Sequence, residues 1–187
     1  MATGTLTNSG TGRSGPLVNF YAGLTRDDCG RLLRDIHAWP DERLESTHDY
    51  IQWLFPLTER SAFNAHAPVL DEEAIAEFRG RAELRENLRR SFVRMLAFYG
   101  FTVQARPLRL LRAASFAERA RVWLSWKNHN HLRITRILKS LTVLGLEEEA
   151  EAFLAALEEL HANLMALREP LISPETMKFW REAIVRK

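Results

Sequence analysis

The chain has 187 residues, a hydrophobic fraction of 46% and a formal net charge of +2. This length suits one domain with a real hydrophobic core, and the composition excludes a largely disordered protein. A single cysteine excludes an internal disulfide, no run of about eighteen apolar residues could span a bilayer, and the N-terminus lacks the pattern of a secretory signal, so we expect a soluble, cytoplasmic protein.

The charge is distributed unevenly along the chain. Residues 79–140 hold 15 basic and 3 acidic side chains, whereas residues 1–78 carry a net −6 and residues 141–187 a net −4. Two interpretations are open: acidic helices pack against basic ones, or a basic face binds nucleic acid or another anionic partner. The side chains that would form such a face are Arg81, Arg85, Arg89, Arg136 and Lys139. Arginine outnumbers lysine by 22 to 4, which is typical of a GC-rich, bacterial genome.

Residues 1–16 hold four of the nine glycines and few apolar side chains. Such a segment cannot bury enough surface to offset its ordering entropy. We therefore expect a flexible tail over residues 1–16 and one helical domain over residues 17–187.

Apolar spacing, caps and breakers predict about eight helices. The first runs from an N-cap at Thr25 to Ile36 and turns Cys29 inward. The second runs from Asp41 to Phe55 and is apolar nearly all round, which is typical of a buried helix. The remaining helices are expected over residues 71–78, 81–99, 107–111, 115–123, 130–144, 146–167 and 173–184. With strand patterns nearly absent, we predict an all-α fold, a single compact multi-helix bundle.

Three details sharpen this prediction. Asp71 and the Ser173-Pro174 pair are typical of helix starts, and Asn128 or Asn130 could cap the helix that follows them. Gly100 is typical of a helix end. Residues 146–167 place apolar side chains at alternating spacings of four and three, which is an a/d seam of either a bundle helix or a homodimer.

Polar residues that stand in apolar surroundings are the candidate site. His48 and Gln52 lie one turn apart on the predicted buried helix. Burying such groups is costly unless each is hydrogen-bonded, so they form either a structural network or the lining of a ligand pocket. The candidate ligand-binding set is His48, Gln52, Asn64, Asn128, His129, Asn130 and Arg133.

No catalytic residue, metal site or cofactor is predicted. His129 and His131 could supply two metal ligands, but a zinc site needs three or four that converge. The acidic pairs and runs open helices, where the helix dipole accounts for them.

Four ordered segments resemble the opioid growth factor receptor family. His48–Pro56 (HDYIQWLFP) looks like the signature of its conserved region, and Asn19–Tyr21, Ser61–Pro68 and Asn128–Leu141 agree with it. The resemblance implies that animal members are receptors for an enkephalin-type pentapeptide, are associated with the nuclear envelope, and have no assigned catalytic residues. A membrane-associated or nuclear location is therefore the alternative to a cytoplasmic one.

The residues and the resemblance together predict a non-enzymatic binding module, with a short peptide or a protein as its partner. We expect the ligand near His48 and Gln52, with Asp49 or Glu45 as carboxylates for a peptide ammonium group. The alternative is a nucleic-acid or anionic-partner binder that uses the basic 79–140 region.

Overall fold

The computed structural model describes residues 14–62 and 64–185, so nearly all of the predicted tail lies outside the described residues. Within these ranges the chain forms ten helices and one two-stranded hairpin. The helices are α1 (Pro16–Tyr21), α2 (Leu33–His37), α3 (Asp41–Ser46), α4 (Ile51–Leu54), α5 (Glu72–Gly80), α6 (Ala82–Tyr99), α7 (Phe116–Trp123), α8 (His129–Val143), α9 (Glu147–Ala166) and α10 (Pro174–Ala183), and the strands are β1 (Phe101–Ala105) and β2 (Leu108–Arg112).

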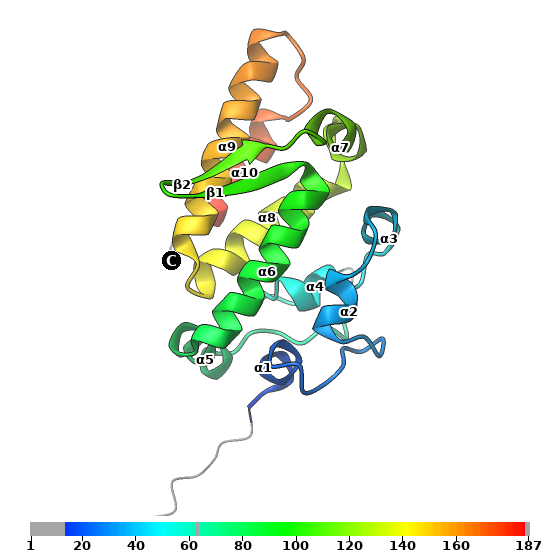
Figure 1. Ribbon diagram of the computed structural model, residues 1–187, viewed down its shortest axis with the longest axis vertical. Helices are drawn as coiled ribbons and strands as arrows, with labels where there is room; N and C mark the ends of the chain where they lie inside the picture. The colour runs from blue at the N-terminus through cyan, green and yellow to red at the C-terminus, as the bar shows by residue number, and fades with distance from the viewer. Residues whose placement is uncertain (1–13, 63, 186–187) are drawn as a thin grey trace, which may run out of the picture.

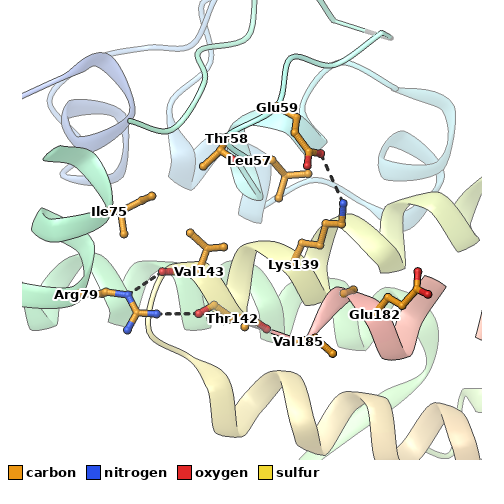
Figure 2. Close-up of a pocket in the computed structure, with 11 residues that line it drawn as sticks. Leu57, Thr58, Glu59, Ile75, Arg79, Lys139, Thr142, Val143, Glu182 and Val185 are labelled. Atoms are coloured by element: carbon orange, nitrogen blue, oxygen red, sulfur yellow. Dashed lines mark hydrogen bonds and ion pairs between the residues drawn. The ribbon is translucent and has the colours of Figure 1, made fainter. Parts of the chain in front are cut away.

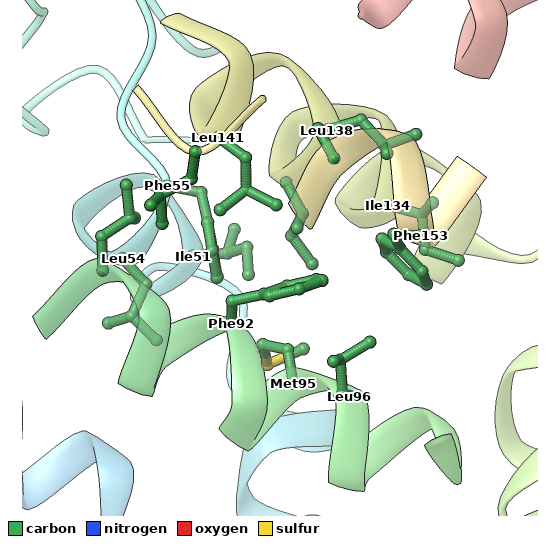
Figure 3. Packing of buried hydrophobic residues seen from close by; sticks show 14 of the residues in the cluster. Ile51, Leu54, Phe55, Phe92, Met95, Leu96, Ile134, Leu138, Leu141 and Phe153 are labelled. Atoms are coloured by element: carbon green, nitrogen blue, oxygen red, sulfur yellow. The ribbon is translucent and has the colours of Figure 1, made fainter. Parts of the chain in front are cut away.

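Helix α6 is the centre of the arrangement, with α1–α4 on one side of it and α8–α10 on the other (Figure 1). The core lies between these groups. Figure 3 shows side chains of α4, of Phe55 directly after it, and of α6, α8 and α9 meeting there. Phe55, Phe92, Leu138 and Phe153 are each at most 2% exposed. Because one continuous core joins both groups, the described residues behave as one packing unit.

Several helix boundaries agree with the sequence prediction because local hydrogen bonds set them. Asp71 Oδ1 accepts from the Ala74 amide at 2.8 Å, which starts α5. The Asn128 side chain caps α8 and the Ser173 side chain caps α10 in the same way. Gly100 ends α6 in the left-handed region at φ 84°.

The predicted a/d seam of residues 146–167 is buried within the chain itself except at its last position, Leu167, which is 69% exposed. Its members Ala150, Phe153, Leu157 and Leu160 are at most 2% exposed. Helix α9 packs on α8, on α10 and on β2. These four side chains therefore build the intramolecular core, and a homodimer through the remainder of the seam stays a prediction.

The helix predicted from Thr25 begins only at Leu33. Asp27 is buried, and its Oδ1 accepts from the amides of Cys29 and Arg31 at 3.0 and 2.8 Å. A carboxylate that binds nearby backbone amides competes with a helix for them. The backbone also takes a positive φ of 77° at Gly30. Cys29 is consequently exposed, which corrects its prediction as a core thiol.

The single helix predicted over residues 41–55 is divided into α3 and α4. Thr47 takes an extended conformation, with φ −103° and ψ 134°, and ends α3. The break places His48 on the surface instead of on the buried face predicted for it, whereas Gln52 on α4 is 4% exposed.

The short helix predicted around Pro107 is strand β2, so the fold is largely but not purely helical. Antiparallel pairing sets Val103 opposite Leu110 and Ala105 opposite Leu108. The leucines of β2 therefore alternate between two faces of a hairpin, and this pairing overrides the helical preference of leucine and arginine.

A candidate ligand pocket beside the α3–α4 turn

Hydrogen bonds from Arg133 of α8 hold the α3–α4 turn in place. This guanidinium is 5% exposed, and it donates to the carbonyl oxygens of Leu44 at 3.1 Å, Glu45 at 3.3 Å and Thr47 at 2.8 Å. In an uninterrupted helix these carbonyls would accept from amides four residues further on. Arg133 takes their place as donor, so a buried arginine explains why the predicted helix breaks here.

His48 of the α3–α4 turn and His129, the first residue of α8, face one another. Their rings meet edge to face, with centroids 5.3 Å apart. The His48 Nδ1 lies 3.0 Å from Arg133 Nη2, and because a guanidinium only donates, this nitrogen accepts and the proton of a neutral ring sits on Nε2. Burial lowers the pKa of His129 despite the Glu45 carboxylate at 3.4 Å, so His129 is mostly neutral at pH 7.

A pocket of about 520 Å³ opens between α4, the following loop and α8. This volume is in the range of small-molecule and peptide-end sites. Apolar side chains form part of its wall, and polar groups converge on it from three segments of the chain. The lining residues are His48, Ile51, Gln52, Leu57, Ser61, His129, Leu132, Arg133, Thr135, Arg136 and Lys139.

Gln52 is the least satisfied polar group of this lining. Its Nε2 donates to Ser61 Oγ at 3.3 Å, but its Oε1 is buried without a hydrogen-bond partner among the described residues. Leaving such an acceptor unpaired costs on the order of 1–3 kcal/mol. A ligand N–H or O–H that reached this amide would remove the cost.

The three predicted asparagines lie outside the pocket lining. Asn64 donates to the Asp49 carbonyl and accepts from two backbone amides of its own loop. Asn128 caps α8, and Asn130 donates to Glu45 Oε2 at 3.0 Å. Their amides are satisfied by the fold, so these residues form the structural network that the sequence left as an alternative.

The seven predicted site residues therefore separate into two groups. His48, Gln52, His129 and Arg133 line the pocket, whereas the asparagines fix the loops around it. The sequence did not indicate the other lining residues as members of a site, namely Ile51, Leu57, Ser61, Leu132 and Thr135. Leu132 is 61% exposed on α8. An exposed leucine beside a histidine pair is the pattern that could have indicated Leu132 as a site residue.

A second hollow of about 390 Å³ lies further along α8 (Figure 2). It shares Leu57 and Lys139 with the first pocket. Lys139 Nζ stands 3.5 Å from the exposed Glu59 carboxylate, and Arg79 donates to the carbonyls of Val143 and Thr142. The same face of α8 thus borders both hollows.

The cations predicted for an anionic partner have partners within the chain. Arg81 pairs with Glu77 at 2.7 Å, and Arg89 pairs with Glu149 at 2.8 Å. Arg85 donates to the carbonyls of Phe78 and Arg79. Arg136 donates to the Phe55 carbonyl at 3.1 Å, and Lys139 pairs with Glu59. These contacts support the interpretation that acidic helices pack against basic ones.

The two histidines considered as metal ligands point to different places. His129 faces His48 at the pocket, whereas His131 is 5% exposed and packs edge to face on Trp180, with ring centroids 5.5 Å apart. Over residues 14–62 and 64–185, no cluster of three or more His, Cys, Asp or Glu side chains could hold a metal ion. In the same ranges, no helix is both long and apolar enough to cross a membrane.

Fold and pocket together define a small, largely helical protein with a ligand-sized hollow beside a clamped turn. The sequence model of the opioid growth factor receptor (OGFr) conserved region matches residues 19–187. The chain belongs to this family, which confirms the resemblance.

Curated relatives agree with this assignment. The opioid growth factor receptor of Homo sapiens is 42% identical over 136 residues, which cover 71% of this chain and 20% of that protein. The same receptor of Rattus norvegicus is 46% identical over 122 residues, 63% of this chain and 21% of that protein. The opioid growth factor receptor-like protein 1 of Mus musculus is 35% identical over 139 residues, 74% of this chain and 29% of that protein. The chain thus spans between a fifth and a third of these relatives, and no solved structure matches it.

Proposed function

We propose that this chain is a non-enzymatic binding module that takes a short peptide in the pocket between α4 and α8. The observation that carries the proposal is the position of the pocket. Its walls come from His48–Pro56 and Asn128–Leu141, two of the segments that mark the family. Two relatives of the chain, 42% and 46% identical over the matched residues, are named receptors.

The chemistry of the lining suits a peptide. Ile51, Leu57 and Leu132 offer apolar contact to a side chain. The Gln52 amide carries both a donor and an acceptor, so it matches the N–H and C=O groups of a peptide unit. An uncharged, purely apolar ligand would leave the Gln52 oxygen unpaired.

The length of the α8 face suits a peptide of about five residues. The two hollows are lined by α8 positions from His129 to Val143. Fourteen helical steps span about 21 Å. Five extended residues span about 17 Å, so such a peptide could lie along most of this face and reach from one hollow into the other.

Calorimetric titration with an enkephalin-type pentapeptide tests the proposal. We expect binding that Thr135→Trp weakens at least tenfold, because the indole would fill the pocket. Gln52→Leu should weaken binding similarly while leaving the free energy of unfolding unchanged or higher, because it removes an unpaired buried oxygen.

Gln104→Leu on β1 is the matched control, since it makes the same chemical change outside the pocket lining. Its affinity should equal that of the unsubstituted chain. Equal affinity in all four proteins, or no heat of binding at millimolar peptide, would contradict a peptide site in this pocket.

A further inference from the structure

The charged side chains that line the pocket are all of one sign. Three side chains of its lining are cationic, namely Arg133, Arg136 and Lys139, and no carboxylate is present among the described residues that line it. The carboxylates expected to hold a peptide ammonium already have partners within the chain. Asp49 pairs with Arg31 at 2.7 Å. Glu45 accepts from Asn130 at 3.0 Å and lies 3.4 Å from His129 and 3.6 Å from Arg133. The hollow therefore favours an anionic group over an ammonium group.

The three cations differ in the donors that they leave for a ligand. Arg133 already donates to three carbonyls, to Asn130 and to His48. Arg136 is half-buried and makes one hydrogen bond, to the Phe55 carbonyl, with no carboxylate within ion-pair distance in the described chain. Burial lowers its pKa, but the side chain stays charged at neutral pH.

Lys139 is the second available cation. It stands one turn beyond Arg136 on α8, and residues three apart on a helix are neighbours. Its partner Glu59 is 3.5 Å away, and the Glu59 side chain is 69% exposed. An exposed pair at this distance contributes little, so Lys139 can exchange it for a ligand anion at low cost.

We propose that the pocket binds a carboxylate attached to an apolar group, such as the C-terminal residue of a peptide, with the carboxylate on Arg136 and Lys139. The apolar group then lies against Leu57 and Leu132, and the ammonium end of a peptide stays outside this pocket. This inference rests on the proposed function for its occupant, and it reverses the orientation expected from Asp49 and Glu45.

Three small leucine derivatives test it, of which the first two are matched in size. N-acetyl-L-leucine carries a carboxylate and an apolar side chain, N-acetyl-L-leucinamide is its neutral counterpart, and L-leucinamide carries an ammonium group. Titrations followed by NMR shifts of the His48 and His129 rings should give a Kd about tenfold lower for the acid than for either amide. Equal Kd values for the acid and its amide, or tighter binding of L-leucinamide, would overturn the inference.

Two substitutions locate the carboxylate. Lys139→Gln and Arg136→Gln should each weaken the acid about fivefold to tenfold and leave the neutral amide unchanged. Lys139→Gln removes only an exposed ion pair, so it remains informative if Arg136→Gln unfolds the chain through loss of the Phe55 contact. Arg109→Gln on β2 is the control and should bind all probes as the unsubstituted chain does. Acid binding that survives both pocket substitutions would overturn the assignment to these cations.

The same titrations separate this inference from the proposed function. A pentapeptide that binds equally with a free or an amidated C-terminus would retain the peptide site and overturn the carboxylate site. N-acetyl-L-leucine binding without pentapeptide binding would retain the carboxylate site and overturn the peptide function. If no probe binds, both are overturned.

Discussion

The buried, positively charged guanidinium of Arg133 donates hydrogen bonds to the carbonyl oxygens of Leu44, Glu45 and Thr47. Arg133→Met keeps the apolar bulk but leaves three carbonyls without their donor. We expect the free energy of unfolding to fall by about 3–5 kcal/mol in urea denaturation, as for other buried charge networks that lose one member.

Arg133→Lys is the matched control for charge. An ammonium group cannot reproduce the planar fork that serves acceptors on two nitrogens, so we expect an intermediate loss. A loss below about 1 kcal/mol in Arg133→Met would mean that water replaces the guanidinium, and the account of the helix break would fail.

His131 gives the stability of the chain a dependence on pH. Burial lowers its pKa to about 4, against a hydrogen bond to the Trp123 backbone that raises it. The unfolded chain, with a histidine pKa of about 6.5, therefore binds more protons than the folded chain between these values. Stability from this group is fully present above pH 6.5 and is lost as the pH falls toward 4.

The expected loss from His131 is about 1–3 kcal/mol between pH 7 and pH 4. Carboxylates titrate in the same range, so the comparison is with His131→Phe, which keeps an aromatic ring beside Trp180. As the pH falls from 7 to 4, the unsubstituted chain should lose about 1–3 kcal/mol more unfolding free energy than His131→Phe does. A constant difference would show that His131 can be protonated without unfolding.

At the scale of elements, Gly100 fixes the path from α6 into the hairpin. Its φ is 84°, and an added Cβ would stand 2.7 Å from the Phe116 Cα. Gly100→Ala should therefore lower the free energy of unfolding by about 3 kcal/mol or more, from both the left-handed backbone and the clash.

Gly30 is the matched control, with φ 77° and nothing within 4 Å of an added Cβ. Gly30→Ala should cost only the backbone preference, about 1 kcal/mol. Equal losses in thermal or urea unfolding would show that the contact with Phe116 relaxes.

The elements that the sequence predicts well are those whose limits are local. Asp71, Asn128 and Ser173 cap their helices with their own side chains, and a cap can be seen in the sequence. The α3–α4 break could not be predicted, because the donor that replaces the helical amides stands on α8. The hairpin was missed because cross-strand pairing overrides the helical preference of a leucine- and arginine-rich segment.

The candidate site was predictable to the same extent. His48, Gln52, His129 and Arg133 could be selected as polar groups in unusual surroundings, and they line one pocket. The apolar wall of that pocket could not be predicted from the sequence, because it depends on how Leu132 of α8 lies relative to the loop after α4. The ligand role of all four residues remains a prediction.

At the scale of the whole molecule, the basic middle of the chain is balanced by its acidic ends. Arg89 pairs with Glu149 beyond it, and Arg94 pairs with Asp41 before it. Arginines without an ion pair in the described chain include Arg106 and Arg109 of the hairpin and Arg112, whose guanidinium lies over the Phe116 ring.

This balance limits any affinity for nucleic acid. Three hairpin arginines predict a slope of log K against log salt of about −3 or shallower. Replacing Arg106, Arg109 and Arg112 with glutamine should weaken retention on a DNA column at low salt more than replacing Arg81, Arg85 and Arg89 does. A steeper slope that depends on Arg81, Arg85 and Arg89 would restore the anionic-partner alternative.

The hydrogen bonds from Arg133 to the α3–α4 turn also matter for the order in which the chain is synthesised. The turn leaves the ribosome early, but the Arg133 contacts with His48 and Thr47 span 85 and 86 residues of chain. A nascent chain that stops before α8 would expose the carbonyl oxygens of Leu44, Glu45 and Thr47 to water. It would also lack the wall of the pocket that α8 supplies. Synthesis of α8 is therefore the event that can complete the site.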